Sequence, residues 1–258
     1  MNGNFEIYLK QYLRSRPLFL SLLRAKEAFL YSNYLPLTPP VLDFGCGDGY
    51  FAKVAFAGNF IDVGLDVKES RINEAKKYQI YKKLVIYDGK VIPYKTNSFS
   101  TVVSNSVLEH VADLDQVIGE INRIIKPRGK FLTTVMTKKW EEYLFGTKIF
   151  GGFYKKYMRK KQVHINLLTR KQWEEKFKKA GFKIVKVSGH LDKFLSSLLD
   201  ILHYISLPSL VSYQILGKWV LFPKIADIIY PRKLLIKLMS NNPAPNVSGA
   251  LFFELEKR

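Results

Sequence analysis

Residues 41–49 read Val-Leu-Asp-Phe-Gly-Cys-Gly-Asp-Gly. The apolar start of this stretch predicts a buried strand, and the glycines after it predict a tight turn whose backbone can approach a ligand closely. Asp66 ends the next apolar run, about 20 residues further on, where a carboxylate can bind both hydroxyls of a ribose. The stretch therefore predicts an α/β domain with a ligand site at one edge of its sheet.

The sequence around this stretch alternates short apolar runs with helical repeats up to Val135, which is typical of a parallel sheet built from βαβ units. Apolar residues recur at helical spacing from Leu114 to Ile125, and residues 17–31 predict a helix that leads into the sheet. An aromatic and basic stretch, 138–161, suits a mobile covering loop with helical pieces, or equally a plain surface excursion. Strands are expected at residues 41–44, 60–65, 84–87, 100–104, 131–135, 182–187 and 250–255.

Two glycine-rich motifs compete for the turn. A dinucleotide-binding fingerprint would need its third glycine at Tyr50, where the side chain is bulky. With Gly49 after the turn and Asp43 before it, the stretch instead resembles the first motif of class I S-adenosylmethionine-dependent methyltransferases, most closely the type 11 group. The resemblance covers residues 41–135, and its supporting segments are Asp88-Gly89, residues 97–103, Leu108-Glu109-His110-Val111 and residues 126–130.

The resemblance implies a fold as well. Family members have a Rossmann-like, seven-stranded sheet of order 3-2-1-4-5-7-6, with strand 7 antiparallel and helices on both faces. Residues 182–187 and 250–255 would then be strands six and seven. The methyltransferase domain would comprise residues 1–189 and 247–258, and the apolar segment 190–246 would be a helical insertion between the last two strands.

The resemblance also implies S-adenosylmethionine as cofactor. Asp43 would lie near its amino group, Asp66 would hold the ribose, and Asp88 would accept a hydrogen bond from the adenine amino group. The segment from Ser104 to Ser106 would lie near the sulfonium. In the alternative interpretation the glycines only shape a turn in another α/β protein, and Cys46 only fills a small space. The expected cofactor-binding residues are Asp43, Gly45, Cys46, Gly47, Asp66, Asp88, Gly89, Ser104 and Asn105.

Methyl transfer from a sulfonium is an in-line displacement that requires no metal, so alignment of the acceptor supplies much of the catalysis. A hydroxyl acceptor also needs a base to remove its proton. His110 is the first candidate, because it follows strand four where similar enzymes face the methyl group, and Glu109 is the alternative member of the pair. His164 is a second candidate, although a structural role is the stronger interpretation for it. His190 and His203 are expected to be surface or insertion residues.

Composition limits the setting and the partners. Lys plus Arg number 41 and Asp plus Glu number 22, so the net charge is +19 and anionic partners are expected. One cysteine excludes an internal disulfide framework and a cysteine-based zinc cluster. The N-terminus shows no signal-peptide pattern, and the most apolar run, 201–217, is interrupted by Pro208. A cytoplasmic protein, peripheral at the inner face of the membrane, is the expectation.

The acceptor is inferred from the insertion. Residues 195–205 have one apolar face, and residues 232–238 alternate leucine with Lys and Arg, a pattern that suits helices lying in an anionic membrane interface. The same faces could instead pack onto the sheet domain or onto a second subunit. The preferred hypothesis is O-methylation of a small-molecule or lipid-linked acceptor at the membrane surface.

Two other functions stay open. The positive charge also suits RNA, although Ser104-Asn105-Ser106-Val107 lacks the Asn/Asp-Pro-Pro-aromatic motif of amino methyltransferases that act on bases, which makes nucleic acid the less favoured partner. A cofactor-binding but non-catalytic scaffold at the membrane is the third hypothesis.

Overall fold

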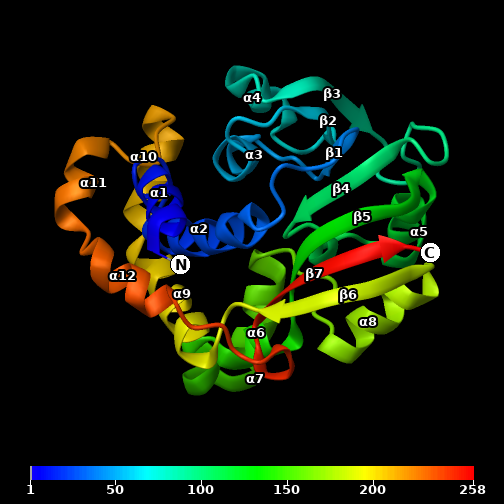
Figure 1. Cartoon of the computed structure of the whole chain (residues 1–258). Coiled ribbons are helices and arrows are strands. Elements are labelled where there is room, and N and C mark those ends of the chain that lie inside the picture. Colours follow the sequence, from blue (N-terminus) through cyan, green and yellow to red (C-terminus); the bar gives the residue numbers. More distant parts are fainter. Residues whose placement is uncertain (1) are drawn as a thin grey trace.

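A single seven-stranded sheet of order β3-β2-β1-β4-β5-β7-β6 runs through the molecule (Figure 1). The computed structural model describes residues 2–258. This order, with β7 antiparallel to both β5 and β6, confirms the predicted fold class. The strands are β1 (Val41–Phe44), β2 (Ile61–Val67), β3 (Tyr81–Tyr87), β4 (Phe99–Asn105), β5 (Ile125–Met136), β6 (Phe182–Gly189) and β7 (Ala250–Lys257).

The parallel register brings three strand ends to one edge. Phe44 of β1 pairs with Leu65 of β2, and Asp43 pairs with Val103 of β4. The residues that follow these strands therefore meet at the carboxyl edge, which is where ligands bind in open α/β sheets.

Helices cover both faces of the sheet. One face carries α5 (Leu114–Ile124) and α8 (Arg170–Lys179), whose buried side chains pack with the strands into one apolar cluster. The other face carries α1 (Asn2–Leu13), α2 (Leu18–Ser32) and α3 (Tyr50–Ala55). Short helical segments complete this part of the chain, namely α4 (Ile72–Ala75), η1 (Lys76–Tyr78), η2 (Leu108–His110) and η3 (Pro245–Val247).

The aromatic and basic segment after β5 folds into two helices, α6 (Lys138–Tyr143) and α7 (Phe145–Lys161). Gly151 interrupts α7 with φ +56°, a backbone conformation that glycine adopts without steric cost. The stretch is therefore more regular than the covering loop that its composition suggested.

The segment between β6 and β7 is helical, as its amphipathic pattern predicted. It contains α9 (Lys193–Ile205), α10 (Leu207–Leu216), α11 (Pro223–Ile229) and α12 (Arg232–Met239). Figure 1 shows these helices beside α1 and α2, and the apolar faces of α9 and α12 join the same buried cluster as those two helices. Among the described helices, none could cross a bilayer alone, while α9 and α10 together have the length and composition but are bent by 46°.

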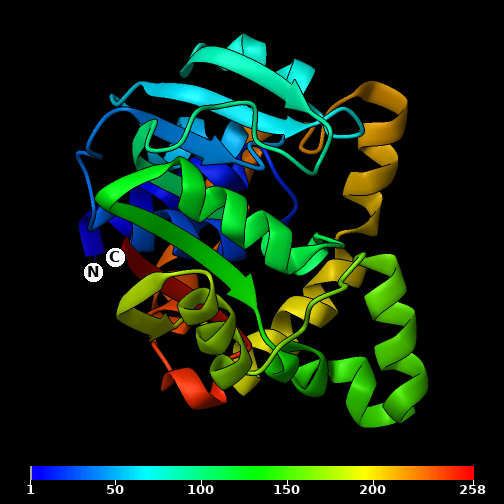
Figure 2. The same ribbon diagram turned by 90° about the vertical axis from the view of Figure 1, so that its right-hand side faces the viewer.

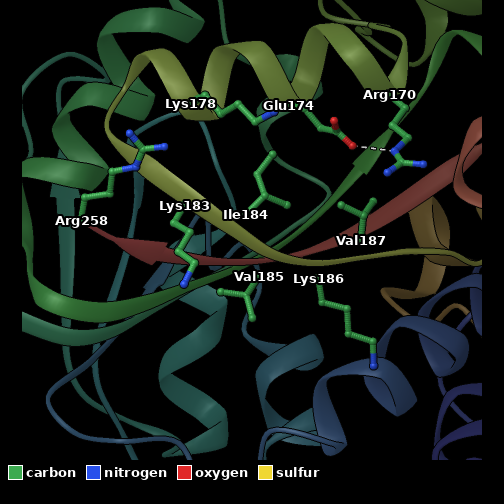
Figure 3. A pocket seen from close by; sticks show the side chains of 9 residues that line it. All are labelled: Arg170, Glu174, Lys178, Lys183, Ile184, Val185, Lys186, Val187 and Arg258. Carbon is green, nitrogen blue, oxygen red and sulfur yellow. Dashed lines mark hydrogen bonds and ion pairs between the residues drawn. The ribbon is translucent and has the colours of Figure 1, made fainter.

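The free edge of the sheet, at β6, is strongly basic. Figure 3 shows the side chains there, with Lys183 and Lys186 on the strand and Arg170, paired with Glu174, on α8 above it. Lysines on an edge strand discourage pairing with another chain, because each added strand would have to bury or approach their charges. In the strand order, β6 lies at the opposite end from β3. This basic surface is therefore separated by several strands from the carboxyl ends of β1 and β2.

Candidate active site

The glycine turn after β1 is held against the end of β2. The backbone N–H of Gly45 donates to the carbonyl of Leu65 (2.8 Å), and that of Gly47 donates to Oδ2 of Asp66 (2.7 Å). Gly45 has φ +75°, and a Cβ there would lie 2.4 Å from Cγ2 of Val107. Only glycine fits this position, so the turn lies close to both β2 and the segment after β4.

A cavity of about 590 Å³ opens beside this turn, at the carboxyl edge of the sheet. Asp66 and Asp88 supply carboxylates on its wall, while Val67, Tyr87 and Val107 supply apolar surface. Carboxylates suit sugar hydroxyls and an amino group, and apolar walls suit a flat heterocycle. The expected base His110 lies on this wall, together with four of the nine expected cofactor-binding residues: Gly45, Asp66, Asp88 and Gly89.

Asp88 is exposed, and its Oδ1 accepts hydrogen bonds from the backbone N–H groups of Lys90 (2.8 Å) and Val91 (3.0 Å). These two bonds hold the pKa of Asp88 below its usual range. The carboxylate is therefore ionised and fixed at the rim of the cavity.

Asp43 and Cys46 lie behind the cavity wall and do not line it. The buried Asp43 carboxylate accepts a hydrogen bond from the Tyr81 hydroxyl (2.6 Å), and burial raises its pKa to about 7. Burial likewise raises the pKa of the Cys46 thiol far above its usual range, so this cysteine is inert filler of the turn. Gly47 does not line the cavity, but its backbone N–H donates to the carboxylate of Asp66, which does. A Cβ on Gly47 would meet no atom within 4 Å.

The wall after β4 is formed by Ser106 instead of Ser104 or Asn105. Ser104 is fully buried, and its carbonyl accepts from the Tyr31 hydroxyl (2.7 Å). The Asn105 side chain donates to Glu27 (3.0 Å) and accepts from Thr134 (2.9 Å). Ser106 has φ +52°, and this turn of the backbone brings it to the cavity.

A buried carboxylate on α2 fixes that wall. Glu27 accepts hydrogen bonds from Arg24 (2.5 Å), Ser106 (2.9 Å) and Asn105 (3.0 Å). Burial opposes its ionisation, but the Arg24 charge and the surrounding donors outweigh burial and lower the pKa of Glu27 to about 2. The ionised Glu27 thus ties α2 to the end of β4.

Glu109, His110 and His164 form a cluster at the same edge. Their potential ligand atoms all lie within 4.8 Å of one another, and the two imidazole rings stack at 5.1 Å. Nδ1 of His110 lies 3.0 Å from the carbonyl of Val163, so Nδ1 carries the proton and Nε2 keeps its lone pair. The cluster can take up a proton, and its donor set could also hold a divalent cation.

Burial sets the protonation of this cluster. Glu109 is fully buried, and neither of its carboxylate oxygens has a hydrogen-bond partner. Burial raises the pKa of Glu109 to about 8. Desolvation lowers the pKa of His110, and desolvation together with the neighbouring His110 lowers that of His164 to about 3. Near pH 7 both imidazoles are therefore neutral and Glu109 is mostly protonated.

A second, smaller cavity of about 270 Å³ adjoins the first. Both cavities are lined by Ser106 and His110. The walls of the smaller one come from α2, η2, α6 and α9, and its apolar lining residues are Phe19, Leu20, Leu23, Met136, Trp140 and Leu199. Two ligands bound in these cavities would meet beside His110.

A family model described as a methyltransferase domain matches residues 7–187 of this chain. The chain belongs to this family. Its sheet order is that of the class I methyltransferases, so this is a class I methyltransferase domain with S-adenosylmethionine as its cofactor, as the glycine turn predicted. The finer assignment to the type 11 group stays a prediction.

Similar proteins have several activities. Over 97 residues, which make up 36% of this chain and 28% of that protein, the chain is 34% identical to a human mitochondrial arginine hydroxylase. It is 27% identical to a ubiquinone biosynthesis O-methyltransferase of Coxiella burnetii over 58% of this chain and 65% of the relative, so both matches span less than two thirds of the relative. An S-adenosylmethionine-dependent methyltransferase structure from Thermotoga maritima superimposes with a TM-score of 0.59 at 18% identity, covering 99% and 98% of the two chains, which supports the fold.

The larger cavity fits S-adenosylmethionine. Asp66 and Asp88 are the lining carboxylates that could hold its ribose and its adenine amino group, and these two assignments stay predictions. Ser106 and His110 line the part of this cavity that adjoins the smaller one.

The sequence did not predict that α2 forms part of the wall of the site. Lys26 and Glu27 are both fully buried, and two adjacent charged residues inside an otherwise apolar helix were the signal that could have revealed it. The expectation for His190 was wrong in part. It begins the insertion, but it is fully buried, with Nε2 3.9 Å from Glu27, because α2 covers it.

Proposed function

We propose that this protein transfers the methyl group of S-adenosylmethionine to an oxygen of a lipophilic or lipid-linked acceptor at a membrane surface. The observation that carries the proposal is the junction of the two cavities at Ser106 and His110. It provides one space for the cofactor, a second and mainly apolar space for an acceptor, and a neutral imidazole between them.

The bound cofactor supplies an electrophilic methyl group on a sulfonium. His110 has the geometry of the base, because its Nδ1–H donates to Val163 and its Nε2 lone pair is free to accept the acceptor's proton. Glu109 and His164 surround this imidazole and, being mostly uncharged near pH 7, leave it basic. The Arg24–Glu27 pair holds Ser106 and thereby the wall on which the two ligands meet.

The acceptor cavity favours an apolar molecule. Phe19, Leu23 and Trp140 form much of its wall, while its polar groups lie beside the cofactor cavity, on α2, after α7 and on α9. The ubiquinone biosynthesis O-methyltransferase among the relatives is consistent with a lipophilic acceptor and with oxygen as the acceptor atom.

Exposed apolar side chains support the membrane location. Ile215 on α10 is 75% exposed, Ile228 on α11 is 84% exposed, and Phe153 on α7 is 78% exposed. In Figure 2, α10 (yellow-orange) and α7 (green) project from the same side of the molecule. Exposed apolar side chains on a chain of net charge +19 suit the interface of a membrane with anionic headgroups.

Transfer of a labelled methyl group tests the proposal. The protein is incubated with S-adenosylmethionine labelled in the methyl group and with a cell lysate, which is then separated into lipid, RNA, protein and small-molecule fractions. The proposal predicts label in the lipid or apolar small-molecule fraction, with His110→Ala as the inactive control.

Label in RNA would instead support the alternative of an RNA methyltransferase, for which the basic surface over β6 offers a binding site (Figure 3). Cofactor binding without label in any fraction would support the non-catalytic scaffold. Either result would overturn the proposed function.

A further inference from the structure

The α9 wall of the smaller cavity carries an imidazole without a partner. Both ring nitrogens of His203 are buried and form no hydrogen bond. The ring is held edge-on against Phe19, with centroids 4.8 Å apart. Leaving buried donors and acceptors unpaired costs free energy, so these nitrogens are available to a group that enters the cavity.

The polar neighbours of His203 are already engaged. The carboxylate of Asp200 accepts from the Tyr154 hydroxyl (2.6 Å) and from the backbone N–H of Gly146 (3.0 Å). The amide oxygen of Gln162 accepts from Nε1 of Trp140 (3.0 Å). Among the described residues that line this cavity, those whose buried side-chain polar atoms lack a hydrogen-bond partner are Glu109 and His203.

These two groups lie on different elements of the wall. Glu109 belongs to η2, next to His110 and the cofactor cavity, whereas His203 belongs to α9. The remaining wall is largely apolar and includes Leu23 and Leu199. Desolvation and the Lys161 charge lower the pKa of His203, against the opposing charge of Asp200, so near pH 7 the ring offers one donor and one acceptor.

We propose that the smaller cavity binds an apolar acceptor with two oxygen functions, one of which is methylated beside His110 while the other hydrogen-bonds to His203. The inference rests on the proposed function and specifies its acceptor. In the reaction the acceptor oxygen forms a bond to the methyl carbon as the bond from that carbon to sulfur breaks. The hydroxyl proton passes to Nε2 of His110, and the sulfonium leaves as the neutral thioether. The volume of about 270 Å³ suits one substituted ring, or the head of a larger lipid.

Small phenols test this specificity. The probes are 3-propylphenol and its analogues with a second hydroxyl ortho, meta or para to the first. Their dissociation constants are measured by calorimetry with the full-length protein saturated with S-adenosylhomocysteine. At least one dihydroxy probe should bind about tenfold more tightly than 3-propylphenol, because it pairs the buried imidazole.

The variant His203→Phe keeps a ring against Phe19 but removes both nitrogens. It should lose the tenfold preference and bind 3-propylphenol as the wild type does. His203→Asn retains a donor and an acceptor and should recover part of the preference. Ile205→Ala, at an exposed position of the same helix, is the matched control and should change neither constant.

The inference is overturned if no dihydroxy probe binds more tightly than 3-propylphenol, or if His203→Phe keeps the preference while its thermal unfolding is unchanged. Failure of S-adenosylhomocysteine to bind would overturn the proposed function itself. Absence of the preference in the wild type, with intact cofactor binding and intact methyl transfer, would overturn the specificity alone.

Discussion

Glu109 and His110 are adjacent residues with different proposed roles: His110 accepts the proton of the acceptor, and Glu109 stays mostly protonated beside it. Glu109 is fully buried without a hydrogen-bond partner, whereas His110 reaches the space shared by both cavities. Their pKa values are displaced from the ordinary values in opposite directions, both chiefly by loss of water. The pH dependence of the reaction can therefore tell which residue takes the proton.

If His110 is the base, kcat/KM should rise with pH below about 6.5 and then level off, because desolvation places the pKa of His110 below its ordinary value. The variant Glu109→Gln should keep this profile. The measurement is the rate of labelled methyl transfer from pH 5 to 9, repeated with a chelator. A profile that rises near pH 8 and loses that rise in Glu109→Gln would instead identify Glu109 as the base.

Glu109 should also make stability depend on pH. Its pKa is raised from 4.5 to about 8 on folding, so the native state binds more protons than the unfolded state between these values. The free energy of unfolding should consequently fall as pH rises from about 4.5 to 8, and Glu109→Gln should remove this loss. Relative to wild type, the variant should gain on the order of a few kcal/mol between pH 5 and 8.5 in urea titrations.

The exposed Glu175 supplies the control for that experiment, since Glu175→Gln should not alter the pH dependence. If Glu109→Gln changed the free energy of unfolding equally at pH 5 and 8.5, this would contradict a buried Glu109 with a raised pKa.

At the scale of elements, local signals predicted most of the fold. The apolar runs identified all seven strands, and the helical repeat from Leu114 to Ile125 identified α5. Contacts between distant segments could not be predicted. β5 begins at Ile125, six residues before the expected start, because Ile125 pairs with Phe99 across a register shift.

The same distinction holds for the site. Gly45 and Asp88 directly follow β1 and β3, and Asp66 lies near the end of β2, so their convergence at one edge could be predicted. The acceptor cavity brings together α2, α6 and α9, which no local pattern relates to one another. The position of Ser106 depends on Glu27, which lies 79 residues away in the chain.

The capping box of α8 gives a test at this scale. The Thr169 hydroxyl accepts from the backbone N–H of Gln172 (3.3 Å), and the Gln172 side chain accepts from the backbone N–H of Thr169 (2.9 Å). Thr169→Ala should lower the free energy of unfolding by about 1 kcal/mol, because one helix N–H loses its partner. Thr169→Ser should be close to neutral in the same denaturant titration, and equal losses in both variants would contradict the capping role.

For the whole molecule, the central feature is that the helices beside the acceptor cavity also lead to exposed apolar surface. α9 lines the cavity, and α10 follows it directly with Ile215 exposed. The proposed membrane contact through α10 therefore involves the helix that directly follows the cavity wall.

Vesicle flotation tests this arrangement. The protein should float with vesicles that contain anionic lipid and should be released by salt, because both charge and apolar contact contribute. Ile215→Glu combined with Ile228→Glu should reduce the bound fraction about tenfold by placing charges in the interface. Phe60→Glu, at a 70% exposed position before β2, is the matched control. Equal flotation of wild type and the double variant would contradict membrane contact through α10 and α11.

Binding of S-adenosylmethionine, measured by calorimetry for the wild type and for Asp66→Ala, tests the central claim most directly. The account predicts binding by the wild type and by Asp115→Ala, an exposed carboxylate outside the cavity, and a loss of about 100-fold in Asp66→Ala, because the ribose loses its charged acceptor. Unchanged affinity in Asp66→Ala, or no binding by the correctly folded wild type, would contradict it.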